Sequence, residues 1–180
     1  MDADCIAGNI AEVSGRVRAA AEKAGRDPEA VHVLAVSKTH PAEAVRAAYA
    51  AGLRHFGENY LQEAEEKIAA TRDLDGIHWH FIGPVQSNKT RAIAAHFDWV
   101  HSVDRLKIAR RLSEQRPAEL APLRVCLQVN ISGEASKSGV APDALPALAA
   151  AVAELPRLEL RGPLAIPAPY ASTAVHREPF

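Results

Sequence analysis

Residues 31–50 read VHVLAVSKTHPAEAVRAAYA, and this stretch contains the unit from which the fold is built. Val31–Val36 is a short, mostly apolar run rich in valine, which is typical of a buried strand. Helical periodicity then predicts a helix over Pro41–Ala51, because proline is tolerated in the first turn of a helix. A strand followed at once by a helix is the repeating unit of parallel α/β folds.

The same alternation continues along the chain. Before it, apolar residues spaced by three and four predict an amphipathic helix that ends near Gly25. Further strands are predicted at Arg54–Gly57, Ile77–Ile82, Trp99–Val103, Leu123–Ile131 and Leu158–Ile166. Helices are predicted between them at Tyr60–Ala70, Asn88–Ala95, Asp104–Glu114 and Pro142–Glu154. This order indicates parallel strands with helices outside them.

Two architectures contain such a repeat, a doubly wound sheet and a (β/α) barrel. The glycine-rich phosphate motifs of nucleotide-binding sheets, G-x-G-x-x-G after the first strand and G-x-x-x-x-G-K-[ST], do not occur. Polar residues gather instead where successive strands end, at Lys38, Glu58–Asn59, Gly83–Lys89 and Asn130–Ser132. A barrel builds its active-site face at the carboxyl ends of its strands, so we favour an α/β fold of the TIM-like barrel type.

The predicted barrel is incomplete. A closed (β/α)₈ barrel needs eight strands, and the sequence predicts six. Residues 165–180, AIPAPYASTAVHREPF, form a polar, proline-containing stretch in which no seventh strand is predicted. We therefore expect residues 1–180 to be a single barrel domain, truncated before its last two β/α units, in which the first and sixth strands do not pair.

Composition excludes several classes of protein. The 180 residues are 48% hydrophobic and 24% charged, and 21 basic against 22 acidic residues leave a net charge of -1. This balance predicts no nucleic-acid partner and no anionic membrane partner. Cys5 and Cys126 form no C-x-x-C pair, so neither a disulfide framework nor a thiolate metal site is expected. An acidic N-terminus without a long apolar run predicts a cytoplasmic protein.

Lys38 is the first candidate site residue. It follows the first predicted strand, where alternation would place it on one face with Leu34 and Val36. One interpretation is a surface lysine with its stem packed and its charge in water. The other is a lysine that forms a Schiff base, since a primary amine can attack a carbonyl carbon. Spacing alone does not separate the two.

Further candidates follow the second and third strands. Asn59 either caps the next helix or contacts a flat ligand above the barrel. His78 and His80 are two residues apart and share a strand face, which suits zinc, but no third ligand lies at a comparable strand end. We therefore expect no metal. Lys89 and Arg91 lie at a predicted helix start within residues 83–91, GPVQSNKTR. This segment is either an anion-binding site or a solvated first turn.

Five segments together resemble the pyridoxal phosphate homeostasis proteins, also called the proline synthetase co-transcribed family. They are AVSKTHP (35–41), FGENYLQE (56–63), WHFIGPVQSNKTR (79–91), QVNISGEASKSGV (128–140) and LELRGPLAIPAP (158–169). That family resembles the N-terminal barrel of alanine racemase. The resemblance implies a barrel that binds pyridoxal 5'-phosphate (PLP), and the lysine of its V-S-K-T motif falls on Lys38.

The resemblance implies a function in the homeostasis of intracellular PLP. The protein would hold PLP as a Schiff base on Lys38 without known turnover, hence with no catalytic residue, and PLP-requiring apoenzymes would be its partners. We expect Asn59 and His80 to line the PLP site, with Lys89 and Lys137 peripheral. The alternatives are a PLP-dependent racemase-like enzyme, which needs acid–base groups on both faces of the cofactor, and a cofactor-free Schiff-base aldolase.

Two departures from the family pattern bear on these expectations. Pro163 stands where the family usually has a residue with a backbone donor in the sixth strand. The family's phosphate-binding loops and the arginine that faces the pyridine nitrogen come from segments that would follow Phe180. We therefore expect this chain to bind PLP weakly.

Overall fold

The structure is a computed structural model that describes residues 2–131 and 138–166. It contains six strands that follow one another in the order of the chain, from β1 to β6. The strands are β1 (Ala35–Val36), β2 (His55–Glu58), β3 (His78–Phe81), β4 (Trp99–Val103), β5 (Leu123–Val129) and β6 (Leu158–Ala165). Among the described strands β6 is not paired with β1, which confirms the expected open, six-stranded parallel α/β sheet.

Helices alternate with these strands. They are α1 (Ala3–Lys23), α2 (Ala42–Ala50), α3 (Leu61–Ala70), α4 (Thr90–His96), α5 (Leu106–Gln115) and α6 (Leu145–Ala153), with short 3₁₀ turns η1 (Pro28–Ala30) and η2 (Pro142–Ala144). Among the described residues, no helix is long and apolar enough to cross a membrane. The chain divides into two compact units, residues 1–79 and 80–180, which are described separately.

In the first unit, β1 and β2 pair in parallel, with Ala35 opposite Phe56. Phe56 is buried together with Val45 of α2 and Ala64 of α3. The helix before β2 and the helix after it therefore both contribute to the core. The strand β1 is shorter than the predicted Val31–Val36. Since β2 begins at His55, the register offers no strand partner to residues 31–33, and pairing is confined to the last two residues of the run.

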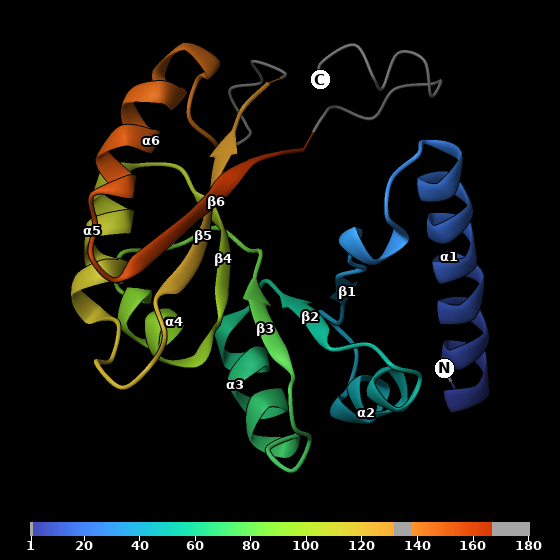
Figure 1. The fold of residues 1–180 in the computed structure, drawn as a ribbon. Helices are drawn as coiled ribbons and strands as arrows, with labels where there is room; N and C mark the ends of the chain where they lie inside the picture. Colours follow the sequence, from blue (N-terminus) through green and yellow to red (C-terminus); the bar gives the residue numbers. More distant parts are fainter. Residues whose placement is uncertain (1, 132–137, 167–180) are drawn as a thin grey trace. The chain divides into compact units, whose positions relative to one another are not determined.

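In the second unit, α4, α5 and α6 lie along one face of β4, β5 and β6 (Figure 1). Along β5, every second residue is buried, because side chains alternate between the two faces of a strand. The buried core of this unit includes Val100, Val103, Ile108, Leu112, Leu123, Val125, Leu127 and Val152. The intervening residues of β4 and β5 include Trp99, His101 and Arg124, so the other face is polar and aromatic.

The proline in β6 is accommodated by a local irregularity. Gly162 has a φ of 141°, and the register of β6 against β5 shifts between Val125 and Cys126. Pro163 follows directly and lies opposite Leu127. Proline lacks a backbone donor and is found in strands beside such bulges, so the departure noted at Pro163 fits within the sixth strand.

Candidate functional site

The segment after β1 is a tight turn formed by residues 37–40. The amide of His40 donates to the carbonyl oxygen of Ser37 at 3.1 Å, and Thr39, the third residue of the turn, has a φ of 65°. Positive φ at this position is the pattern of a type II turn, where glycine is usual. A β-branched residue there is strained, so surrounding contacts must hold it.

Lys38 occupies the second position of this turn. Its side chain is exposed, and among the residues that the structure describes it has no hydrogen-bond or ion-pair partner. The expectation that it shares a strand face with Leu34 and Val36 is wrong, since β1 ends at Val36 and Lys38 lies two residues beyond it. The lysine therefore projects from a turn, and its amine is available.

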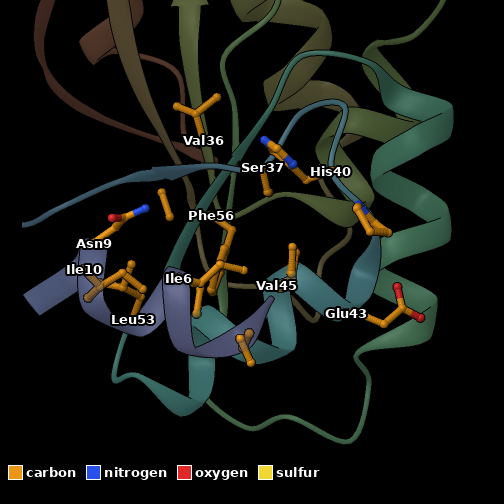
Figure 2. A pocket seen from close by; sticks show the side chains of 16 residues that line it. Ile6, Asn9, Ile10, Val36, Ser37, His40, Glu43, Val45, Leu53 and Phe56 are labelled. Carbon is orange, nitrogen blue, oxygen red and sulfur yellow. The ribbon is translucent and has the colours of Figure 1, made fainter. Parts of the chain in front are cut away.

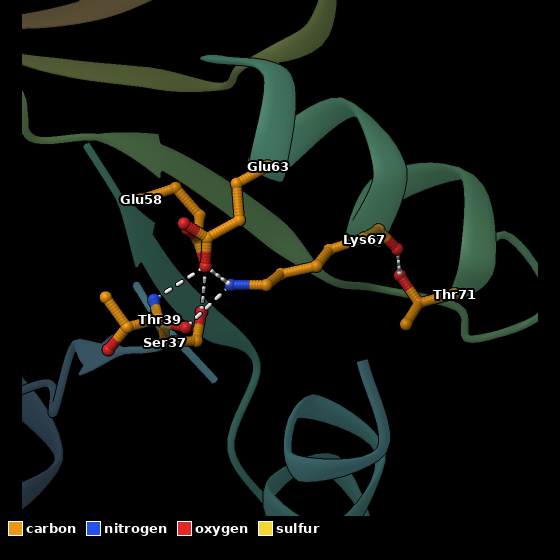
Figure 3. A network of polar contacts seen from close by, with 6 residues as sticks. All are labelled: Ser37, Thr39, Glu58, Glu63, Lys67 and Thr71. Atoms are coloured by element: carbon orange, nitrogen blue, oxygen red, sulfur yellow. Dashed lines mark hydrogen bonds and ion pairs between the residues drawn. The ribbon is translucent and has the colours of Figure 1, made fainter. Parts of the chain in front are cut away.

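A largely buried cluster of charged side chains lies beside the turn (Figure 3). The ammonium group of Lys67 donates to Oε1 of Glu58 at 2.7 Å, to Oε1 of Glu63 at 2.6 Å and to the carbonyl oxygen of Ser37 at 2.7 Å. An ammonium group has three donors, so every donor of Lys67 is used. We call Glu58, Glu63 and Lys67 the Lys67 cluster.

The Lys67 cluster holds the residues on both sides of Lys38. The hydroxyl of Ser37 donates to Glu58 at 2.6 Å, and the amide of Ser37 donates to Gly57 at 3.0 Å. The amide of Thr39 donates to Glu63 at 2.6 Å. Hydrogen bonds from Lys67 and Thr39 lower the pKa of the Glu63 carboxyl below its usual value, with Lys67 the larger cause. The amide of Thr39 thus donates to an ionised carboxylate, and hydrogen bonds to charged acceptors are the stronger ones.

Local structure explains how these side chains meet. Glu58 is the last residue of β2, the strand beside β1, so its carboxylate lies at the carboxyl end of the sheet with the turn. Glu63 and Lys67 are four residues apart in α3 and share one helix face. The hydroxyl of Thr71 donates to the carbonyl oxygen of Lys67 at 2.8 Å, one turn later.

Asn59 follows β2 directly, at the carboxyl end of the strand that pairs with β1. It is half-buried, and its Oδ1 atom has no hydrogen-bond partner among the described residues. The helix-cap interpretation of Asn59 is wrong, since α3 is preceded by Tyr60 as its N-cap, without a side-chain cap. Oε2 of Glu58 is likewise buried and without a partner. Two adjacent residues therefore offer buried acceptors in need of donors.

A cavity of about 330 Å³ borders the turn and is lined by residues of α1, α2 and β1 (Figure 2). Ser37 and His40 form part of its wall, and most of the remainder is apolar, including Ile6, Ile10 and Phe56. Its described lining residues include no lysine or arginine. This cavity therefore provides no fixed cation for a phosphate group.

His80 belongs to the second unit. It is buried within β3 rather than at its end, stacks on Trp99 with ring centroids 5.2 Å apart, and places its Nδ1 atom 2.8 Å from Nε2 of His101. Burial lowers the pKa of His101. Only one of the two facing nitrogen atoms can carry the shared proton, so the pair disfavours two imidazolium ions.

Lys89 and Arg91, the cations expected at a possible anion site, belong to the second unit. Lys89 is the exposed N-cap of α4, whose first residue, Thr90, is fully buried. The carbonyl oxygens of the preceding loop already accept hydrogen bonds from side chains, since Arg111 donates to Ser87 and Arg105 donates to Val85. Lys137 lies outside the described residues. Among those described, no group of three or more His, Cys, Asp or Glu side chains is arranged to hold a metal ion.

The structure thus brings Lys38 and Asn59 to the carboxyl ends of paired strands in one unit, while His80 is part of the other. Sequence reasoning missed Ser37, Glu63 and Lys67. One signal was present: Lys67 stands in line with Ala64 and Thr71 on the buried face of α3, where a lysine needs partners.

Comparisons with known proteins identify the family of this chain. A family model described as the alanine racemase N-terminal domain matches residues 9–178. The pyridoxal phosphate homeostasis protein of Pseudomonas aeruginosa is 69% identical over 175 residues, which are 97% of this chain and 76% of that protein. The solved structure of PipY from Synechococcus elongatus PCC7942 with PLP bound is 41% identical, has a TM-score of 0.73, and the match covers 89% of this chain and 74% of that one.

Alanine racemase from E. faecalis shares the fold, with a TM-score of 0.73 at 19% identity over 99% of this chain and 46% of its own. The parallel α/β sheet and the family model over residues 9–178 thus place the chain in the alanine racemase N-terminal-domain class. Within this class, the chain belongs to the family of pyridoxal phosphate homeostasis proteins. The resemblance inferred from the five sequence segments is confirmed.

Proposed function

We propose that this protein binds PLP through Lys38 and takes part in PLP homeostasis without catalytic turnover. The observation that carries the proposal is the exposed amine of Lys38, which has no described partner. The turn around it is held by hydrogen bonds of Ser37 and Thr39 with the Lys67 cluster. PLP supplies an aldehyde whose carbon bonds to a primary amine with loss of water. Its known presence in PipY, a relative at 41% identity, supports PLP as the ligand.

The residues present fit such a ligand at its aldehyde end. Lys38 supplies the nitrogen nucleophile, and Asn59 offers a buried oxygen that has no described partner before a ligand arrives. We propose that Asn59 and His80 both line the PLP site, with Lys89 and Lys137 peripheral to it. If Asn59→Ala and His80→Ala each left the PLP dissociation constant unchanged, this assignment would be wrong.

A role as carrier rather than enzyme is also a proposal. Racemisation requires acid–base groups on both faces of the cofactor, and tyrosine is one of the side chains that can serve as such a group. Among the described tyrosines, Tyr49 already donates its hydroxyl to the carbonyl oxygen of Asp75, and Tyr60 is an exposed N-cap. Neither supports a second acid–base group, so we expect no turnover of alanine enantiomers.

We propose that residues 1–180 act as one PLP-binding domain in the cytoplasm and deliver PLP to PLP-requiring apoenzymes. Delivery is measured by mixing the PLP-loaded protein with the apo form of a PLP-dependent transaminase. Recovery of transaminase activity faster than with the same total concentration of free PLP supports delivery, and recovery at the free-PLP rate refutes it.

Covalent trapping tests the central proposal. The protein is incubated with PLP, reduced with borohydride and digested, and the modified peptide is identified by mass spectrometry. We expect the label on Lys38 and its loss in Lys38→Ala, while the exposed lysine variant Lys107→Ala retains it. A label spread evenly over surface lysines, with Lys38 no more modified than Lys107, would refute the proposal.

A further inference from the structure

The turn that carries Lys38 adopts a conformation that its own sequence disfavours. Thr39 has a φ of 65° and is the one described non-glycine residue with positive φ. Glycine takes such a conformation freely, whereas a β-branched side chain collides with the neighbouring backbone. Left to itself, the segment from Ser37 to His40 would relax to negative φ, and the direction of the Lys38 side chain would change with it.

The contacts that prevent this relaxation come from Glu63. Its Oε1 atom accepts the amide hydrogen of Thr39 at 2.6 Å and one hydrogen of the Lys67 ammonium at 2.6 Å. A carboxylate oxygen has two lone pairs, so one atom serves both donors. A flip of the Lys38–Thr39 peptide to negative φ at Thr39 would turn this amide away from Glu63, so the hydrogen bond favours the strained shape.

Lys67 and Glu58 fix the other side of Lys38. The ammonium group donates to the carbonyl oxygen of Ser37, and Glu58 accepts the hydroxyl hydrogen of Ser37. Both charged side chains are buried, at 5% and 0% exposure, so their positions are set by packing. Lys67 is saturated with acceptors and enclosed, and it does not compete with Lys38 for an aldehyde.

We propose that Glu58, Glu63 and Lys67 are positioning residues, which hold the strained turn so that the amine of Lys38 is presented to the aldehyde of PLP. The inference rests on the proposed function and extends it to side chains that do not themselves bind the cofactor. The covalent step is the one proposed above: the Lys38 nitrogen bonds to the aldehyde carbon, and the carbonyl oxygen leaves as water.

The test compares Glu63 variants by the trapped label. After a short exposure to PLP and borohydride reduction, the label on Lys38 is measured relative to the label on Lys107 in the same sample. We expect Glu63→Ala to lower this ratio roughly tenfold to a hundredfold, because misplacement of a reacting group costs this much. Glu63→Gln should stay near the wild-type ratio, since its single carbonyl oxygen can accept from both Thr39 and Lys67.

Thr39→Gly provides a rescue that a general loss of stability would not produce. Glycine adopts a φ of 65° without strain, so Glu63→Ala combined with Thr39→Gly should recover part of the ratio. Arg46→Ala is the matched control. It removes an exposed ion pair of the same unit, with Asp73, that does not touch the turn, and it should leave the ratio unchanged.

The outcomes separate the two proposals. If PLP and borohydride do not label Lys38 in the wild-type protein, both the proposed function and the positioning role are overturned. Wild-type labelling of Lys38 together with an unchanged ratio in Glu63→Ala overturns the positioning role alone. If Glu63→Ala does not fold, hydrogen exchange of the wild-type protein decides: the Thr39 amide should exchange at least tenfold more slowly than that of an unstructured threonine, and unprotected exchange overturns the positioning role.

Discussion

The Nζ atom of Lys67 lies 2.7 Å from Oε1 of Glu58, and both side chains are buried. A buried ion pair contributes little net stability, because the cost of removing two charges from water offsets their attraction. The pair therefore matters here through its geometry, since the same atoms hold Ser37 on one side of Lys38. This arrangement links the stability of the first unit to the shape of the lysine turn.

Replacement of one partner of this pair should be strongly destabilising. Lys67→Met leaves the Glu58 carboxylate buried and uncompensated, which should lower the free energy of unfolding by about 3–5 kcal/mol. The measurement is urea unfolding followed by circular dichroism. Arg46→Ala removes an exposed ion pair that water screens, so it should lower the free energy of unfolding much less than Lys67→Met does. Similar losses in both variants would contradict the prediction.

Acid should weaken the turn through Glu63. Its folded-state pKa is lowered, chiefly by the hydrogen bond from Lys67, so the carboxylate binds protons less readily in the folded chain than in the unfolded chain. The stabilisation is complete above the ordinary glutamate pKa and is lost as pH falls below it, through the folded value. Urea unfolding at several pH values should show a shallower loss of stability in Glu63→Gln. An identical pH profile in both proteins would exclude this contribution.

Charge at position 38 should not be sufficient for PLP binding. Lys38→Arg keeps a cation in the exposed turn, but a guanidinium stays protonated and cannot attack an aldehyde. We expect the variant to fold normally and to lose the visible absorbance band of amine-bound PLP. A thermal melt verifies the fold, and a band of wild-type intensity in Lys38→Arg would place the reactive amine elsewhere.

Asn59 should affect ligand binding more than folding. Its Oδ1 atom has no described partner, so Asn59→Ala removes no hydrogen bond of that atom from the unliganded protein and should change the free energy of unfolding by less than about 1 kcal/mol. Loss of one hydrogen bond to PLP should weaken binding by roughly threefold to tenfold. Fluorescence titration with PLP provides the dissociation constant. A large loss of stability with unchanged binding would show that Asn59 is structural.

The His80–His101 pair should make the second unit sensitive to mild acid. Burial lowers the pKa of His101, so the unfolded chain takes up a proton at a pH where the folded chain does not. Stability is therefore full above the ordinary histidine pKa of about 6.5 and falls as pH drops below it. His101→Gln should reduce this dependence between pH 7.5 and 5.5. The exposed His96→Gln is the control, and equal effects of both variants would argue against a role for the pair.

Much of the architecture was predictable because its signals are local. Apolar runs alternating with helical periodicity predicted six strands, their parallel direction and the open order from β1 to β6. The place of Lys38 after the first strand followed from the same pattern. The length of β1 could not be predicted in this way, because pairing depends on where β2 begins. Only Ala35 and Val36 have partners in β2.

By itself, the sequence determined the repeating strand–helix order and the presence of a lysine at the carboxyl end of the first strand, since both depend on periodicity within a few residues. Only the tertiary structure decided that Glu58, Glu63 and Lys67 contact one another and the two residues that flank Lys38. Lys67 is 30 residues from Ser37 in the chain, and Glu58 is 21 residues from it. Whether such charges are buried together depends on how α3 packs beside the β1–β2 pair, which no local pattern records.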